Sequence, residues 1–243
     1  GRDDNPTTWN GTGDGTDFFN YPWWGRLFDD PDFMQLYRDR WNEFRQGPLS
    51  NSNILNVIDS MADEIREAQP RDSAKWGRIS ANGWRTEISN LRSWLATRAD
   101  WMDGQFRLPP SFSPAPGPVT PGFQFTLGGG GTIYYTLDGS DPRAPGGSTS
   151  ASATRYSGAV RLNETARVVA RIRVSSTHWS PPAAGTFYTE LPGIVISEFM
   201  FHPEGPPAGS EFTDEDFEYV ELLNTGNAPV PLAGIRLKGG VDF

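Results

Sequence analysis

The chain has 243 residues, a formal net charge of −9 and no cysteine, and glycine (27) and proline (21) together make up about a fifth of it. The lack of cysteine excludes disulfide bonds, thiolate metal sites and cysteine nucleophiles. The two histidines, His178 and His202, are too few for a histidine-rich metal site. The acidic balance disfavours nucleic acid as a partner, because phosphates need neutralising cations, and no apolar run reaches the roughly 18 residues of a membrane span.

Net charge and residue composition divide the sequence into three expected modules. Residues 1–106 hold 12 basic and 17 acidic residues (net −5), residues 107–190 hold 7 and 4 (net +3), and residues 191–243 hold 2 and 9 (net −7). The first residue is Gly1 with no charged-then-apolar leader after it, and the last residues fall within a strand-like pattern. We therefore expect an internal piece of a longer protein.

The first module is expected to be helical after an irregular but ordered segment at 1–28. Asp30, Pro31 and Asp32 predict a helix start, because a capping carboxylate, a proline at the first helical position and an acid at the positive helix end all favour one. Gly47-Pro48 predicts the end of this helix.

Two more helices are expected in the same module. Ser50 predicts the cap of the second helix and Pro70 its end, and Trp76 is expected in a short turn. A third helix is expected over about 84–102, with Gly104 as its C-cap. Because eight of the nine tryptophans precede residue 107, we expect a heavily aromatic core.

Beyond a proline-dense segment at 108–122, which predicts a linker or a strand entry, the hydrophobic period becomes that of β structure. Strands are expected at 123–127 and 133–137, with the glycines 128–131 as their hairpin turn. The alternation over 166–174 predicts a half-buried strand with a mostly basic outer face, and residues 144–154 predict a mobile loop. A second β pattern opens at 194–196 and continues at 219–223 and 235–237.

Several spaced motifs of the first module resemble the C-terminal part of the bacterial CotH kinase-like family. They are Asn20-Tyr21-Pro22-Trp23-Trp24-Gly25-Arg26-Leu27-Phe28, Asp30-Pro31-Asp32-Phe33, Arg40-Trp41, Leu49-Ser50, Ile58-Asp59-Ser60-Met61-Ala62 and Trp94-Leu95-Ala96-Thr97-Arg98. That family resembles atypical protein kinases and is associated with spore coats and secreted modular proteins. The resemblance implies ATP with Mg²⁺ or Mn²⁺ for the parent protein. The family's nucleotide-contacting lysine and metal-binding aspartates lie earlier in the chain, so no catalytic residue is assigned here, and Asp3 and Asp4 at most border that site.

The other two modules carry resemblances of their own. Residues 132–142, Thr-Ile-Tyr-Tyr-Thr-Leu-Asp-Gly-Ser-Asp-Pro, together with 156–160 and 166–174, resemble the C-terminal domain of chitobiases and hexosaminidases, a fibronectin-like sandwich that often serves as a spacer. Residues 194–203, 218–226 and 230–234 resemble the opening of a lamin-tail domain, an immunoglobulin-like sandwich whose later strands are missing.

These observations predict a multi-domain chain, first α and then β. Residues 1–106 are expected to be the helical C-terminal portion of a kinase-like domain. Residues 107–190 are expected to form a β-sandwich, and residues 191–243 the N-terminal part of a lamin-tail sandwich. With so little of its fold present, the third module is expected to be the least stable.

A calcium loop is one hypothesis for residues 10–17, where acidic and amide oxygens alternate. Asp14 and Asp17 are its candidate metal ligands, and the alternative is a Gly/Asp turn that packs beneath Trp23 and Trp24. Asp138 and Asp141 resemble a carboxylate pair, but their spacing favours a strand-turn-strand connection around Gly139.

Two charged clusters and one tryptophan have competing interpretations. The acidic cluster favours a solvated loop over a divalent-cation contact; its members are Glu211, Asp214, Glu215, Asp216 and Glu218. The arginines favour a solvated strand face over contact with an acidic neighbouring module or an anionic polysaccharide; they are Arg155, Arg161, Arg167, Arg171 and Arg173. Trp179, expected to be exposed beside His178, either stacks on a sugar or seals a module junction.

The function expected from the resemblances is that of a non-catalytic downstream portion of a secreted, modular bacterial protein. Its parent would transfer phosphate from ATP to a protein substrate, outside the cell or at the cell surface. The alternative is a structural protein with an inactive kinase-like fold that binds a cell-surface, matrix or carbohydrate component. A third hypothesis is an accessory region of a glycoside hydrolase. Whether the parent is an enzyme is left open.

Overall fold

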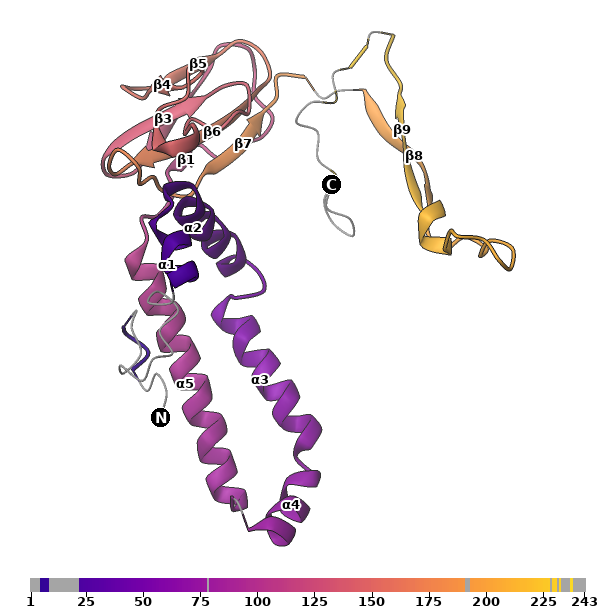
Figure 1. Cartoon of the computed structure of the whole chain (residues 1–243). Coiled ribbons are helices and arrows are strands. Elements are labelled where there is room, and N and C mark those ends of the chain that lie inside the picture. The colour runs from indigo at the N-terminus through magenta and orange to yellow at the C-terminus, as the bar shows by residue number, and fades with distance from the viewer. Residues whose placement is uncertain are drawn as a thin grey trace.

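The computed structural model describes residues 5–8, 22–77, 79–190, 193–227, 229–230, 232 and 237. Within these residues five helices come first and antiparallel sheets follow them; Figure 1 shows this order along the chain. The predicted order of a helical part and then β structure is therefore confirmed. Within the described residues, no helix is long and apolar enough to cross a membrane.

The helix start at residue 30 is as predicted. Helix α2, Pro31–Arg45, has Asp30 as its N-cap, and the Asp30 carboxylate accepts hydrogen bonds from the backbone N–H groups of Asp32 (2.7 Å) and Phe33 (3.1 Å). A short helix α1, Pro22–Asp29, precedes it. The expectation of an irregular segment is wrong for these residues, since their apolar residues already have a helical period.

Helices α3, Asn51–Ile65, and α4, Ala68–Trp76, correct the predicted role of Pro70. The Ser50 hydroxyl caps α3 as expected, by accepting a hydrogen bond from the N–H of Asn53. α3 ends at Ile65, and Pro70 lies in the first turn of α4, where proline costs no hydrogen bond. Trp76 ends α4 rather than lying in a turn, and Gly77 follows with a left-handed φ of 62°.

Helix α5, Ala81–Gln105, is longer than predicted. Ser80 caps its start by accepting from the N–H of Gly83, and Phe106 is its C-cap. Gly104 lies within the helix, so its predicted role as C-cap is wrong. The helix continues to Gln105, and Met102 in its last turn is buried.

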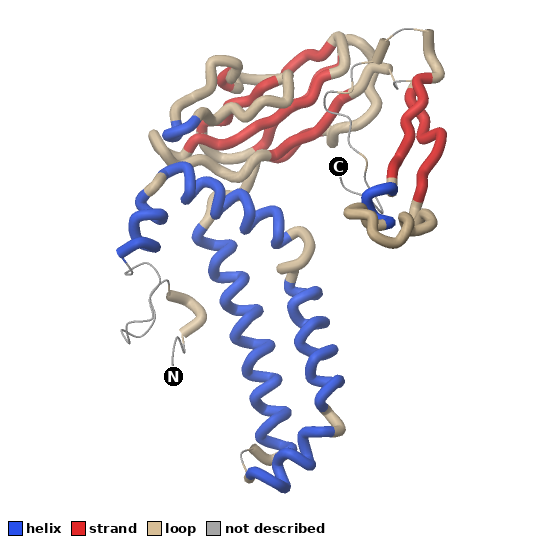
Figure 2. Tube along the Cα trace, turned by 45° about the vertical axis from the view of Figure 1, so that its right-hand side comes forward, coloured by secondary structure: helices blue, strands red, loops and turns tan. Residues whose placement is uncertain are grey.

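Of the aromatic core expected in the helical part, the described residues show a small cluster in which the rings of Phe28, Phe33, Tyr37 and Phe106 meet edge to face, with centroids 5.3–6.0 Å apart. The side chains of Trp9, Trp23 and Trp24 lie outside the described part of the chain. Helices α3 and α5 run side by side as an arm with α4 at its tip (Figures 1 and 2). The buried residues of this part are small or aliphatic or are glutamines: Gln35, Ile58, Gln69, Ala99 and Met102. Trp76 is 59% exposed at the arm's tip. An arm of this kind has too little interior to bury large rings.

The middle of the chain is a two-layered β-sandwich. One sheet has the order β1-β2-β5, formed by Ser111–Ser113, Phe123–Gly128 and Val160–Leu162. The other has the order β4-β3-β6-β7, formed by Thr154–Arg155, Thr132–Thr136, Ala166–Arg173 and Ala183–Phe187. Both sheets contribute side chains to one core, in which the rings of Phe125 and Phe187 stack 4.7 Å apart.

The predicted hairpin at glycines 128–131 is wrong. Strand β2 pairs with β1 and β5, whereas β3 pairs with β4 and β6, so the glycines carry the chain from one sheet to the other. Gly129 and Gly131 have φ of 144° and 115° there. The alternation of residues predicts two strands but does not tell which strands pair.

Two segments without a predicted strand belong to the sandwich. The proline-dense segment contributes strand β1 and a bridge between Pro118 and Tyr188, so its strand-entry interpretation holds. Residues 144–154, predicted to be a mobile loop, contain the 3₁₀ turn Pro145–Gly147 (η2), one residue of the Arg143–Thr149 bridge and the first residue of β4. The small residues here permit tight turns.

The C-terminal part consists of a two-stranded antiparallel ribbon, β8 (Ile194–Met200) and β9 (Tyr219–Asn224), with the 3₁₀ turn Asp214–Phe217 (η3) before β9. Residues 204–213 lack helix and strand. A bulge between Ile196 and Glu198 shifts the register, and Phe199 is 72% exposed. The predicted strand at 235–237 lies largely outside the described residues.

We expect amides of the β8–β9 ribbon to exchange hydrogen much faster than those of β6, because an isolated two-stranded ribbon is marginally stable in water. Hydrogen exchange followed by mass spectrometry will compare residues 194–200 with residues 166–173. Equal protection of the two segments would contradict the expected instability of the third module.

Candidate functional site: the junction of the helices and the sandwich

One face of α2 meets the sandwich through three polar side chains. Asp32, Gln35 and Asp39 follow each other at intervals of three and four residues, so they lie on the same side of the helix. Each of them contacts a residue more than a hundred positions away in the sequence. This face is the place where the helical part and the sandwich join.

Arg171, on the central strand β6, is the middle of the junction. Its guanidinium donates to both carboxylate oxygens of Asp39 (2.8 Å each) and to both oxygens of Asp141 (2.8 and 2.7 Å). It also donates to the Ser180 carbonyl at 2.9 Å, and the residue is only 4% exposed. Burial opposes the charged form, but the bonds to Asp39 and Asp141 outweigh it and raise the pKa of Arg171.

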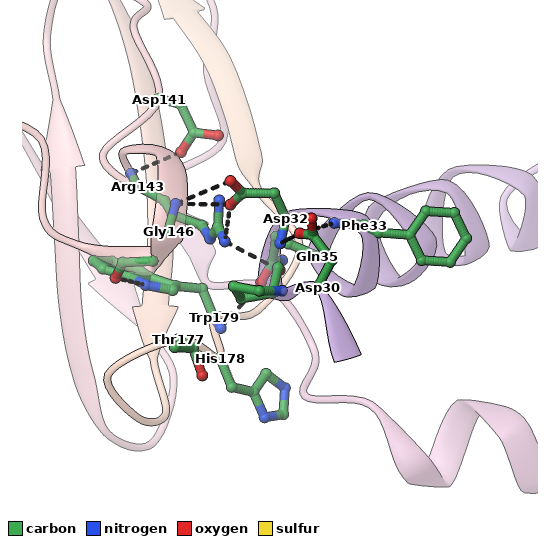
Figure 3. Close-up of polar contacts among 12 residues, drawn as sticks. Asp30, Asp32, Phe33, Gln35, Asp141, Arg143, Gly146, Thr177, His178 and Trp179 are labelled. Atoms are coloured by element: carbon green, nitrogen blue, oxygen red, sulfur yellow. Dashed lines mark hydrogen bonds and ion pairs between the residues drawn. The ribbon is translucent and has the colours of Figure 1, made fainter. Parts of the chain in front are cut away.

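Asp32, at the first turn of α2, makes a second connection. Its carboxylate accepts from the Arg143 guanidinium at 2.5 Å and from the Gly146 N–H at 2.9 and 3.0 Å (Figure 3). The bond from Gly146 and then that from Arg143 lower the pKa of Asp32. The segment expected to be a mobile loop thus holds the start of α2.

Gln35 and Trp179 make the third connection. Gln35 is 3% exposed, and its side-chain oxygen accepts from the Trp179 backbone N–H at 3.1 Å (Figure 3). Trp179 itself is fully buried, and its indole N–H donates to the Gly147 carbonyl at 2.8 Å. The expectation of an exposed Trp179 is wrong, and its alternative role, sealing a module junction, is what the structure shows.

The side chains of this junction hold the two parts of the chain together. Its carboxylates accept hydrogen bonds from arginines, and its amide and indole groups have backbone partners. Within the described residues, no three His, Cys, Asp or Glu side chains come together as a metal site. Paired charges and satisfied polar groups hold surfaces in one register.

The five arginines of the predicted basic face have different surroundings. Arg171 pairs with Asp39 of the net-acidic first module, so for this residue the hypothesis of contact with an acidic neighbouring module is confirmed. Arg173 lies over the ring of Trp179, 5.5 Å from its centroid, and Arg167 contacts the Thr186 hydroxyl. Arg155 and Arg161 are exposed, as a solvated strand face predicts.

Asp138 and Asp141 have the structural roles that their spacing favoured. Asp138 accepts from the N–H and the hydroxyl of Ser140, which lowers its pKa, and Gly139 between them has a φ of 81°. Asp141 accepts from the Arg143 N–H at 2.9 Å in addition to its pairing with Arg171. Asp141 thus supports the junction as well as the turn.

The acidic cluster lies in and around η3 on the ribbon. Asp216 caps this turn together with Thr213, and Glu218 accepts from the His202 N–H. Four of its residues are exposed, as a solvated loop predicts, and Asp214 is half-buried. The candidate calcium ligands Asp14 and Asp17 lie outside the described residues.

Sequence reasoning did not single out Asp32, Gln35 and Asp39 as a unit. Their spacing marks a polar stripe on the helix whose apolar stripe includes Tyr37 and Trp41. A polar stripe on a helix usually faces water. The signal that could have identified it is its charge: two acids of α2 opposite a basic strand.

His178 lies at the edge of the junction and makes the stability of the folded protein depend on pH. Burial, and then the nearby charge of Arg38, lower the pKa of His178, and its Nε2 atom is buried without a hydrogen-bond partner among the described residues. Folding therefore favours the neutral ring. Its contribution is fully present above the unfolded-state pKa of about 6.5 and is lost as the pH falls toward the lower folded-state pKa.

We expect His178→Gln to reduce the loss of unfolding free energy between pH 7.5 and pH 5. Urea unfolding at the two pH values measures this loss. His202→Gln is the matched control, because that side chain is exposed on the ribbon. An equal loss in His178→Gln and in the unsubstituted protein would show that His178 does not titrate differently in the two states.

Comparison with known families found two matches, which fall on different parts of the chain. A family model described as CotH kinase protein matches residues 2–102, and a model described as Fn3 associated matches residues 125–187. The first match covers the helices and the second covers most of the sandwich. A search of curated proteins and a search of solved structures gave no match. The chitobiase and lamin-tail resemblances stay predictions.

Proposed function

We propose that this chain is the non-catalytic downstream portion of a secreted, modular bacterial protein. The catalytic centre of the parent protein would lie upstream and transfer phosphate from ATP to a protein substrate. The CotH match over residues 2–102 supports the kinase-like part of this proposal, and the Fn3-associated match supports its modular part. The chain would work outside the cell or at the cell surface.

The observation that carries the proposal is the buried Arg171 between Asp39 and Asp141. A bidentate arginine pair fixes orientation as well as distance. The sandwich is therefore held on the helices in one orientation, as a support for a neighbouring catalytic centre requires. A flexible spacer does not need a buried charge network, because burying charged groups costs desolvation free energy.

The described residues do not fit a site for ATP and its metal ion. Phosphoryl transfer needs a cation near the phosphates and carboxylates that hold metal ions. Of the two lysines, Lys238 lies outside the described residues, and Lys75 lies at the arm's tip, where its ammonium sits 4.8 Å from the centroid of the Trp76 ring. We therefore derive no catalytic step from these residues.

The carbohydrate-binding alternative loses its main candidate. A tryptophan that stacks on a sugar must be exposed, and Trp179 is fully buried. A structural role with an inactive kinase-like fold is still compatible with the junction. The test therefore has to measure phosphate transfer itself.

We expect this chain to bind ATP weakly or not at all and to transfer no phosphate. Calorimetric titration with ATP and Mg²⁺ or Mn²⁺, together with a radiolabel transfer assay, measures both. Micromolar ATP binding would overturn the proposal. So would autophosphorylation that Asp14→Ala or Asp17→Ala abolishes, because it would place an active site within residues 1–106.

A further inference from the structure

A second feature of the junction is a surface hollow of about 210 Å³. It lies where the C-terminal half of α2 and the end of α5 meet Pro181 of the sandwich. Pockets for drug-sized ligands span about 300–1,000 Å³, so this hollow suits a ligand of one ring. Because both parts of the chain form its wall, it exists only while they are joined.

Some of the charged and polar groups that line the hollow already have hydrogen-bond partners. The Asp103 carboxylate accepts from the Arg45 guanidinium at 2.7 and 2.9 Å and from the Trp41 indole N–H at 2.9 Å. Arg45 also donates to the Asn51 side chain at 3.0 Å. These groups shape the hollow, and Asp103 is not free to bind a ligand ammonium.

The rim offers unused polar groups. The side-chain amides of Asn42 and Gln46 line the hollow and make no hydrogen bond within the described part of the chain. An amide both donates and accepts, as a hydroxyl does, so the two amides match a ligand that is rich in hydroxyl groups. The apolar surface beside them comes from Phe106 and Leu108, and Leu108 is 70% exposed.

Arg107 also lines the hollow and carries a positive charge. Its guanidinium donates to the Gly130 carbonyl, and among the ion pairs of the described residues none involves Arg107. The guanidinium fork is suited to carboxylates. The hollow thus combines an apolar surface, two amides and one uncompensated cation.

We propose that this hollow binds one acidic sugar residue, a pyranose ring that carries a carboxylate. The carboxylate lies against Arg107, the hydroxyl groups bond to the Asn42 and Gln46 amides, and the apolar face of the ring covers Phe106 and Leu108. The site is independent of Trp179 and of the proposed upstream activity.

The test is a titration of the whole chain followed by ¹H–¹⁵N NMR, with sodium glucuronate, glucose and sodium acetate at constant ionic strength. We expect glucuronate to shift the amide signals of residues 42, 46 and 107 saturably, with Kd near about 1 mM, about −4 kcal/mol. Glucose, which lacks the carboxylate, and acetate, which lacks the ring, are each expected to bind at least about tenfold more weakly.

Two variants and one control make the assignment specific. Asn42→Ala and Arg107→Gln are each expected to weaken glucuronate binding about tenfold, and Arg85→Gln, which removes the same charge from the other end of α5, is expected to leave it unchanged. If Arg107→Gln disturbs the sandwich by removing the bond to the Gly130 carbonyl, the result for Asn42→Ala decides whether the site is assigned correctly. Absence of saturable shifts with glucuronate would overturn the proposal. Equal binding of acetate would also overturn it, because it would show a contact with the carboxylate alone. Equal binding of glucose would overturn it as well, because it would show that the charge plays no role.

Discussion

Phe187→Ala is expected to destabilise the sandwich by about 3–5 kcal/mol, which is enough to unfold a module of this size. Phe187 is fully buried, stacks on Phe125 at 4.7 Å and contacts the rings of Phe112 and Phe123. Removing it leaves a cavity that both sheets line. Urea unfolding followed by far-UV circular dichroism measures the effect.

Phe201→Ala is the matched control for this prediction. Phe201 is 74% exposed on the ribbon, and substitutions at such positions usually change stability by less than about 0.5 kcal/mol. A loss for Phe187→Ala as small as that for Phe201→Ala would contradict the assignment of the sandwich core.

Arg171→Met is expected to destabilise the protein by about 3 kcal/mol, the lower end of the cost of breaking a buried ion pair. The substitution leaves the carboxylates of Asp39 and Asp141 without their partner, and both are partly exposed, with side-chain exposures of 21% and 43%, so water recovers part of the loss. Urea unfolding measures the loss. The helical part, which its tryptophans report, and the strands of the sandwich should then unfold at separate urea concentrations.

Arg155→Met is the control, since it removes the same charge from an exposed position of the same module. It is expected to change stability by less than about 0.5 kcal/mol. If Arg171→Met cost no more than Arg155→Met, the junction would contribute nothing to holding the two parts together.

Local features of the fold could be predicted from the sequence because neighbouring residues determine them. Asp30 and Ser50 cap their helices as predicted, since each cap is a bond between a side chain and a backbone group two or three residues away. The turn at Asp138 and Gly139 was predictable for the same reason. Pro70 and Gly104 were misjudged because a proline is compatible with a first turn and a glycine with a helix that tertiary packing supports.

Features that depend on distant contacts could not be predicted. The glycines 128–131 look like a hairpin turn until the partners of β2 and β3 are known. Arg171 looks solvated until α2 brings Asp39 to it across 132 positions of sequence. Trp179 looks exposed for the same reason, since its hydrogen-bond partners, Gln35 of α2 and Gly147 of the sandwich, are distant in the sequence.

The most direct test of the account is the distance between the helices and the sandwich in solution. The chain has no cysteine, so spin labels can be placed at Arg40→Cys on α2 and Ser157→Cys on the sandwich without further changes. Double electron–electron resonance should give one narrow distance distribution for the labelled protein and a broad one after Arg171→Met. A broad distribution in the protein with Arg171 intact would contradict the claim that the junction holds the two parts in one orientation.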